Sequence, residues 1–193
     1  MRSIKIYLLL SIFSGLIAQV ASEHLYYGAS SLSMPGSDIA IPKSSWSMFV
    51  NPAGIAEQKT LSLVASSESL FGQEYFSHAL FGVQFRVPKV GSFGLSIEDF
   101  SVDYSGNSLS RETAVGFHQG IMLRSDRNST ISFGYGIKSY TVDYGSSAGV
   151  SGDGSDGIEL GSQSSWGVDI GLMASLAAGQ RVGARALKIN RQN

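Results

Sequence analysis

The stretch FGLSIEDFSVDY at residues 93–104 decides the fold, and it recurs as FGYGIKSYTVDY at residues 133–144. In the first half of each copy, apolar residues alternate with polar or small ones, which is the pattern of a β-strand with one apolar face. After Glu98, and at the same place in the second copy, the apolar positions change phase, so that Phe100 and Tyr140 begin a second alternating series. We expect a β-bulge at each change of phase. The spacing of the copies fits one spanning hairpin with its connections.

The same alternation dominates from Lys59 to the end of the chain, in six or seven runs close to the length that a tilted strand needs to cross a bilayer. One face of each run is apolar and the other is mixed. Because the interiors of membrane barrels are polar, we expect His78, Gln84 and His118 on the mixed faces to point into a lumen. The apolar faces of four runs carry Ala79, Phe81, Val83, Phe85 and Val87; Val115, Phe117, Ile121 and Leu123; Ile131, Phe133, Tyr135 and Ile137; and Trp166, Val168, Ile170, Leu172 and Ala174.

Short and long connections alternate along the chain. The short ones are expected at residues 88–91, 124–129 and 177–180, and the longer ones at residues 68–74, 105–111 and 145–164. Outer-membrane barrels have this asymmetry, with tight turns on the periplasmic side and longer loops outside. The sequence therefore predicts an all-β fold, an antiparallel transmembrane β-barrel of which about six or seven meandering strands are present, with a short helical plug segment at the N-terminus.

The first 22 residues have the three parts of a secretory signal peptide. Arg2 and Lys5 form a basic start, residues 6–17 are largely apolar, and small residues at 20–22 offer a cleavage site. The alternative is a membrane-anchoring helix, for which this apolar stretch is short of the roughly 20 residues required. Export predicts that the mature chain resides in the outer membrane of a Gram-negative-type bacterium.

Residues 23–58 lack the period-two pattern and form a separate N-terminal lumen or plug segment, which precedes the barrel strands of residues 59–193. Within this segment Asn51 is a good helix N-cap and Pro52 fits a first helical position, so we expect a short helix or turn from Asn51 to Gln58. The motif Asn51-Pro52-Ala53-Gly54 has two interpretations: a hatch that moves with cargo, or a cap and turn that fix the segment in place.

Composition excludes several classes of function. The formal net charge of −1 gives no basic surface for nucleic acid, and the absence of cysteine excludes disulfides and thiolate zinc sites. His24, His78 and His118 are too widely spaced for a local metal motif. The match to G-x-S-x-G at residues 145–149 lies in a Gly/Ser-rich loop without α/β alternation, and residues 153–159 lack the ligand spacing of a calcium loop. We expect no enzymatic activity, no cofactor and no metal.

The run Asn51-Pro52-Ala53-Gly54-Ile55-Ala56, after a signal peptide and before the first strand, resembles the N-terminal signature of the PorV/PorQ proteins and of the related FadL-type fatty-acid-transporter barrels. The run GVDIGL at residues 167–172 is similar to a strand of that group. The resemblance implies a barrel of roughly fourteen strands with the N-terminal segment folded into the lumen. It also implies a role in type IX secretion, as in the PorV branch, or in uptake of hydrophobic molecules, as in the FadL branch.

Two departures from that pattern predict an incomplete barrel, equivalent to its N-terminal half. Only six or seven strands are readable, and residues 188–193 lack the terminal aromatic residue of barrel insertion signals. The expected partners are outer-membrane lipid and a hydrophobic small molecule or secreted protein as cargo, with no nucleic acid. The alternative function is an exported soluble β-sandwich with a structural or adhesive role, whose strands would be shorter and would bury their apolar faces against a second sheet. An exported hydrolase is a weaker third reading.

Overall fold

The computed structural model describes residues 31, 33–34, 37–69, 72–147, 149–152, 155–176 and 179–187. The expected signal peptide, His24, part of the Asp/Gly-rich loop at 153–154 and the C-terminal residues 188–193 lie outside the described residues.

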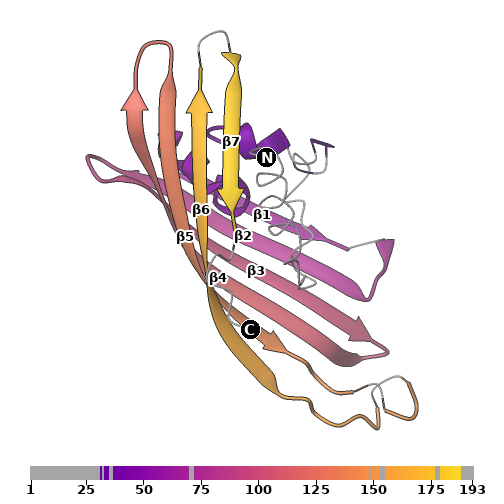
Figure 1. The fold of residues 1–193 in the computed structure, drawn as a ribbon. Helices are drawn as coiled ribbons and strands as arrows, with labels where there is room; N and C mark the ends of the chain where they lie inside the picture. Colours follow the sequence, from indigo (N-terminus) through magenta and orange to yellow (C-terminus); the bar gives the residue numbers. More distant parts are fainter. Residues whose placement is uncertain are drawn as a thin grey trace, which may run out of the picture.

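Within the described ranges, seven antiparallel strands form one sheet in which each strand pairs with the next along the chain. The sheet curves into half of a barrel, and the N-terminal helical turns lie within its curve (Figure 1). The predicted all-β antiparallel fold is confirmed at this level. The strands are β1 (Ser62–Glu68), β2 (Phe76–Val87), β3 (Gly91–Tyr104), β4 (Asn107–Ser125), β5 (Thr130–Asp143), β6 (Ser162–Ser175) and β7 (Arg181–Ala186).

Between residues 37 and 57, three short helical turns precede the sheet: η2 (Ser37–Ala40), α3 (Ser47–Val50) and η3 (Pro52–Glu57). Met48, Phe49 and Ile55 from these turns are almost fully buried, and they form the hydrophobic core together with Val50, Val64 and Leu80. The face of the sheet that contacts these turns is here called the inner face. Among the described residues, no helix has the length and apolar character needed to span a membrane.

The two faces of the sheet have the opposite polarity to that of an ordinary globular sheet. Buried side chains of the inner face are largely polar, and they include Gln84, His118 and Asp169. The opposite, outer face exposes large apolar side chains over β1 to β6, at 47% to 54% for Phe81, Leu95, Val115, Ile137, Trp166 and Leu172. We call this surface the outer apolar band; its members are Leu63, Phe81, Val83, Phe85, Phe93, Leu95, Ile97, Val115, Phe117, Ile121, Leu123, Ile131, Phe133, Ile137, Trp166, Val168, Ile170 and Leu172.

The strand register makes the outer apolar band continuous. Direct cross-strand partners on the outer face form one apolar row through six strands: Leu63, Val83, Leu95, Phe117, Ile137 and Val168. Two outer-face rows further along, toward the end of the sheet with the β3–β4 turn and the β5–β6 connection, the cross-strand partners are polar or small. They are Ser67, Ala79, Asp99, Thr113, Thr141 and Ser164. The band therefore has a sharp edge on that side.

The predicted bulges at the changes of phase are wrong. β3 pairs with β4 without a register shift as far as Val102, and β5 pairs with β6 residue by residue along its whole length. The side chains keep alternating, and the chemistry of each face changes instead. Past Ile97 the outer face becomes polar at Asp99, while Phe100 is buried on the inner face. Among the described residues, the strand register shifts at two other places, between Val102 and Asp103 on β3 and between Met122 and Arg124 on β4.

The longer connection expected at residues 105–111 is also wrong. β3 ends at Tyr104 and β4 begins at Asn107, so Ser105 and Gly106 form a two-residue turn in which both have positive φ, 51° and 83°. This geometry is typical of a tight hairpin, which lets both strands run past the edge of the outer apolar band. The predicted long connection between β5 and β6 is present, from Tyr144 to Gly161.

Candidate functional site: the inner face and the N-terminal segment

A row of three glycines receives the Asn-Pro-Ala motif. Gly120, Gly134 and Gly171 are direct cross-strand partners on the inner faces of β4, β5 and β6. A Cβ built on Gly134 would overlap the backbone of Pro52, and one built on Gly171 would overlap the side chain of Asn51. The row thus allows backbone contact where any larger residue would hold the N-terminal segment away from the sheet.

Asn51 is the best-anchored polar residue of the N-terminal segment. Its side-chain oxygen accepts a hydrogen bond from the amide of Ala53 at 3.1 Å and so caps η3. Its side-chain nitrogen donates to the carbonyl oxygens of Ile39 at 2.8 Å and of Leu172 at 3.2 Å. One side chain therefore ties together two turns of the segment and strand β6.

The rest of the motif is equally enclosed. Pro52, Ala53 and Gly54 are buried within η3, and a Cβ on Gly54 would meet the side chain of Ser47. Arg185 of β7 donates a hydrogen bond to the carbonyl oxygen of Val50 at 2.7 Å. These contacts fit the cap-and-turn interpretation, while a hatch movement would have to break them together.

The expected lumen residues His78, Gln84 and His118 all lie on the inner face, at 2%, 0% and 0% exposure. Gln84 donates to the carbonyl oxygens of Ser45 at 2.5 Å and Ser44 at 3.3 Å, so it holds the N-terminal segment. His78 Nδ1 lies 3.1 Å from a carboxylate oxygen of Glu68 on β1. The structure does not bring the three residues together into one site.

His118 instead belongs to a cluster that the sequence analysis missed. Its Nε2 lies 2.9 Å from Ser96 Oγ on β3. Beside this pair, Lys138 Nζ lies 2.9 Å from Glu98 Oε1 and 3.6 Å from Asp169 Oδ2, and all three charged side chains are at most 9% exposed. We call Lys138, Glu98 and Asp169 the buried ion cluster. Burying a charged group carries a large free-energy penalty unless an opposite charge lies close to it. The stability of this cluster therefore depends on the short distances between Lys138 and the two carboxylates.

A signal for the ion cluster is present in the internal repeat. Glu98 and Lys138 occupy the same position in the two copies, forty residues apart, with opposite charges on the mixed faces of their strands. Gly116 of β4 lies between them, directly paired with Lys138 and Ser96. Without a side chain there, Lys138 reaches across β4 to Glu98.

Ser96 and His118 have the distance of a nucleophile and its base, but their surroundings do not suit catalysis. Both side chains are at most 2% exposed, and His118 Nδ1 has no hydrogen-bond partner among the described residues. An active serine needs a third group to orient the histidine and a place for the substrate. The pair is therefore a structural hydrogen bond within the sheet.

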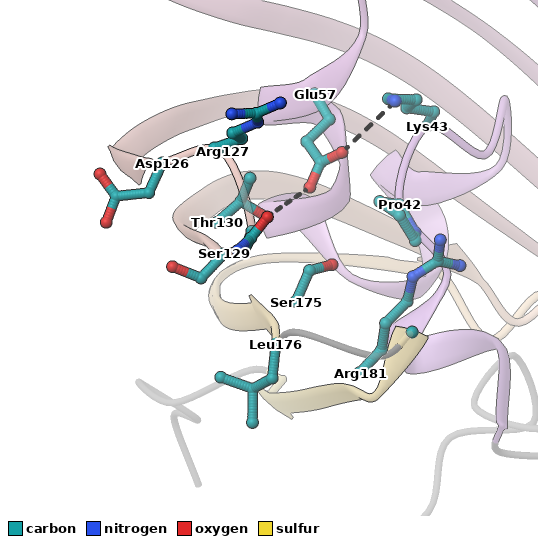
Figure 2. A pocket seen from close by; sticks show the side chains of 12 residues that line it. Pro42, Lys43, Glu57, Asp126, Arg127, Ser129, Thr130, Ser175, Leu176 and Arg181 are labelled. Atoms are coloured by element: carbon teal, nitrogen blue, oxygen red, sulfur yellow. Dashed lines mark hydrogen bonds and ion pairs between the residues drawn. The ribbon is translucent and has the colours of Figure 1, made fainter.

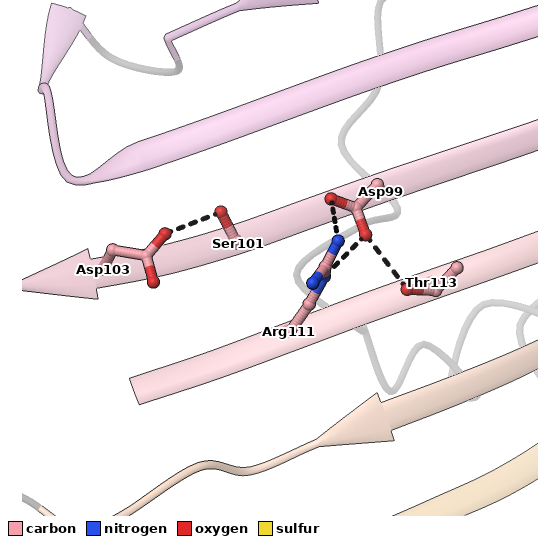
Figure 3. Close-up of polar contacts among 5 residues, drawn as sticks. All are labelled: Asp99, Ser101, Asp103, Arg111 and Thr113. Carbon is pink, nitrogen blue, oxygen red and sulfur yellow. Dashed lines mark hydrogen bonds and ion pairs between the residues drawn. The ribbon is translucent and has the colours of Figure 1, made fainter. Parts of the chain in front are cut away.

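Beyond the edge of the outer apolar band, the outer face carries its own polar contacts (Figure 3). Arg111 donates two hydrogen bonds to the carboxylate of Asp99, at 2.9 and 3.2 Å, and Thr113 donates to the same carboxylate at 3.0 Å. Ser101 donates to Asp103 at 3.0 Å. The outer face at this end of β3 and β4 is therefore polar and exposed.

The structure describes only part of the remaining motifs, the G-x-S-x-G match and the Asp/Gly-rich loop. Residues 145–147 and 149 of the G-x-S-x-G match lie in the connection between β5 and β6, whose described residues form no helix. No group of three or more potential metal ligands occurs among the described residues. No family model, curated protein or solved structure matches this chain.

Proposed function

We propose that this protein is a non-enzymatic outer-membrane β-barrel component of the PorV or FadL type, which takes part in transport or secretion across the outer membrane. One observation carries the proposal: the outer apolar band is exposed, whereas the inner face buries polar and charged side chains. In water a sheet is stabilised by burying its apolar face and exposing its polar face. A sheet surrounded by lipid is stabilised by exposing its apolar face and enclosing its polar face.

The dimensions of the band support the same environment. On β4 the band extends from Val115 to Leu123, interrupted by Gln119, and on β6 the apolar outer positions continue one step past the band, to Ala174. Both stretches are close to the roughly 9–11 residues that a tilted strand needs to cross a bilayer. A soluble β-sandwich would cover this face with a second sheet, and would not require buried ions on the opposite face.

The N-terminal segment supports a role in passage through the barrel. It occupies the inner face through Asn51, Gln84 and the glycine row, so movement of cargo along this face would have to displace it. The proposal includes two kinds of cargo, a hydrophobic small molecule or a secreted protein. It also includes the role of Asn51-Pro52-Ala53-Gly54 as a hatch that moves with the cargo.

The test uses the absence of cysteine in the chain. Single cysteines replace Phe81 or Val115 in the outer apolar band, and each is labelled with an environment-sensitive fluorophore in lipid vesicles. We expect strong quenching by brominated acyl chains at both positions. The matched control is Ser101→Cys, an outer-face position beyond the band, where we expect little quenching.

Membrane fractionation and gel mobility provide an independent check. A closed barrel resists sodium dodecyl sulfate until it is boiled, so we expect the unboiled protein from the membrane fraction to migrate differently from the boiled one. Recovery in the soluble fraction, with quenching at Phe81 no greater than at Ser101, would rule out the proposal and favour the β-sandwich.

A further inference from the structure

A cavity of about 560 Å³ lies at the end of the sheet that carries the short turns. The N-terminal segment contributes Pro42, Lys43 and Glu57, and the β4–β5 turn contributes residues 126–129 (Figure 2). The remaining lining residues are Thr130, Ser175, Leu176, Gly179 and Arg181. We call this space the turn cavity. Its three walls come from parts of the chain that are far apart in the sequence.

The two carboxylates of the turn cavity already have partners. Glu57 accepts a hydrogen bond from Thr130 at 3.1 Å on one oxygen and lies 3.7 Å from Lys43 Nζ on the other. Asp126 is 2.6 Å from the guanidinium of Arg124, which lies outside the cavity lining. Both acidic groups are therefore compensated by a cation of their own.

The ion pairs of these two carboxylates do not include Arg127 or Arg181, which also line the cavity. Neither guanidinium has an ion pair or hydrogen bond with any described residue, and both side chains are exposed. Arg127 comes from the β4–β5 turn and Arg181 is the first residue of β7, so the two cations line the cavity from separate elements. Guanidinium groups bind phosphate and carboxylate oxygens through paired hydrogen bonds, and phosphate offers oxygens in enough directions for two such groups.

We propose that the turn cavity binds a phosphate group through Arg127 and Arg181. The cavity is larger than a bare phosphate, and Asn128, Ser129 and Ser175 add neutral polar groups beside the apolar Leu176 and Pro42. This lining suits a phosphate carried on a small polar molecule or on a lipid headgroup. Binding of phosphate itself does not require that the sheet spans a membrane, so this proposal stands apart from the proposed function.

The test uses the full chain, purified in an uncharged maltoside detergent, and inorganic phosphate as the probe, followed by titration calorimetry. The variant Arg127→Gln/Arg181→Gln should lower the affinity for phosphate by at least about tenfold, because it removes both charged donors. The matched control is Arg111→Gln, which removes an exposed arginine from the other end of the sheet and should leave the affinity unchanged. Circular dichroism checks that each variant is folded.

A second arm identifies the source of the phosphate. Native mass spectrometry counts the molecules of phosphatidylglycerol that the protein retains, compared with phosphatidylcholine. Retention of phosphatidylglycerol that the double variant loses identifies a lipid headgroup, and phosphate binding without such retention identifies a free phosphate compound. No saturable phosphate binding, or equal weakening in Arg111→Gln, overturns the proposal.

Discussion

Ser96 Oγ lies 2.9 Å from Nε2 of His118 on the neighbouring strand, and both side chains are buried on the inner face of the sheet. The other ring nitrogen of His118 has no hydrogen-bond partner among the described residues. Among the described residues, the only hydrogen-bond partner of this buried ring is therefore the hydroxyl of Ser96.

Removing the Ser96 hydroxyl alone should lower the free energy of unfolding more than removing the hydroxyl and the His118 ring together. In Ser96→Ala the buried ring loses its described partner, and we expect the free energy of unfolding to fall by about 1–3 kcal/mol. In Ser96→Ala/His118→Leu no polar ring remains to be satisfied, so the loss should be smaller. Urea unfolding in lipid vesicles measures both variants, and a double-variant loss equal to or larger than that of Ser96→Ala would contradict the coupling.

The glycine row predicts an unequal response to the same substitution. Gly134→Ala places a methyl group against the backbone of Pro52, which cannot yield without lifting the N-terminal segment, and should destabilise the protein by about 1–3 kcal/mol. Gly94→Ala is the matched control, because its new methyl group meets only side chains, at 3.3 Å or more. Proteolysis of the N-terminal segment should accelerate only in Gly134→Ala, and equal rates would refute the close approach.

The buried ion cluster predicts a strong effect of Lys138. Lys138→Met leaves Glu98 and Asp169 buried without their shared cation, so we expect a loss of about 3–5 kcal/mol in urea unfolding. The triple variant Lys138→Met/Glu98→Gln/Asp169→Asn removes the uncompensated charges and should recover part of that stability. Failure of the triple variant to recover any stability would show that the charges are not the cause.

The outer apolar band predicts position-dependent penalties for arginine in lipid. Leu95→Arg introduces a charge in the middle of the band, and we expect a loss of about 2–4 kcal/mol in unfolding from vesicles. Ser101→Arg, six residues further along the same face of β3, should cost about 0–1 kcal/mol. Similar penalties at the two positions would show that the face is not divided by a membrane boundary.

The connection between β5 and β6 should lose local order in acid. Hydrogen bonds from the hydroxyl and amide of Ser151, and from the amide of Val150, hold the pKa of the exposed Asp156 carboxyl below its usual value. A lowered pKa in the folded state means that the stabilisation is present above the unfolded pKa, near 3.9, and is lost as the pH falls through the lower folded value. Amide exchange at Val150 and Ser151 measures this change, and Asp156→Asn should abolish its pH dependence.

The alternation of apolar and polar residues in the sequence alone determined where the strands lie and which face each side chain occupies. The period of two in runs such as residues 78–87 sufficed to predict the strands, and it assigned Phe81 and Gln84 to opposite faces, because side chains of an extended chain must alternate. The pair Asn51-Pro52 likewise predicted a capped turn, since capping depends on neighbouring residues only.

The tertiary structure decided what depends on neighbouring strands. The change of phase in residues 93–104 is no bulge, because regular pairing with β4 holds the backbone in register while the chemistry of the outer face changes. The glycine row, the buried ion cluster and the turn cavity each join residues from three or more separate segments. Local periodicity carries no information about which segments meet, so only the register of the folded sheet brings Glu98, Lys138 and Asp169 together.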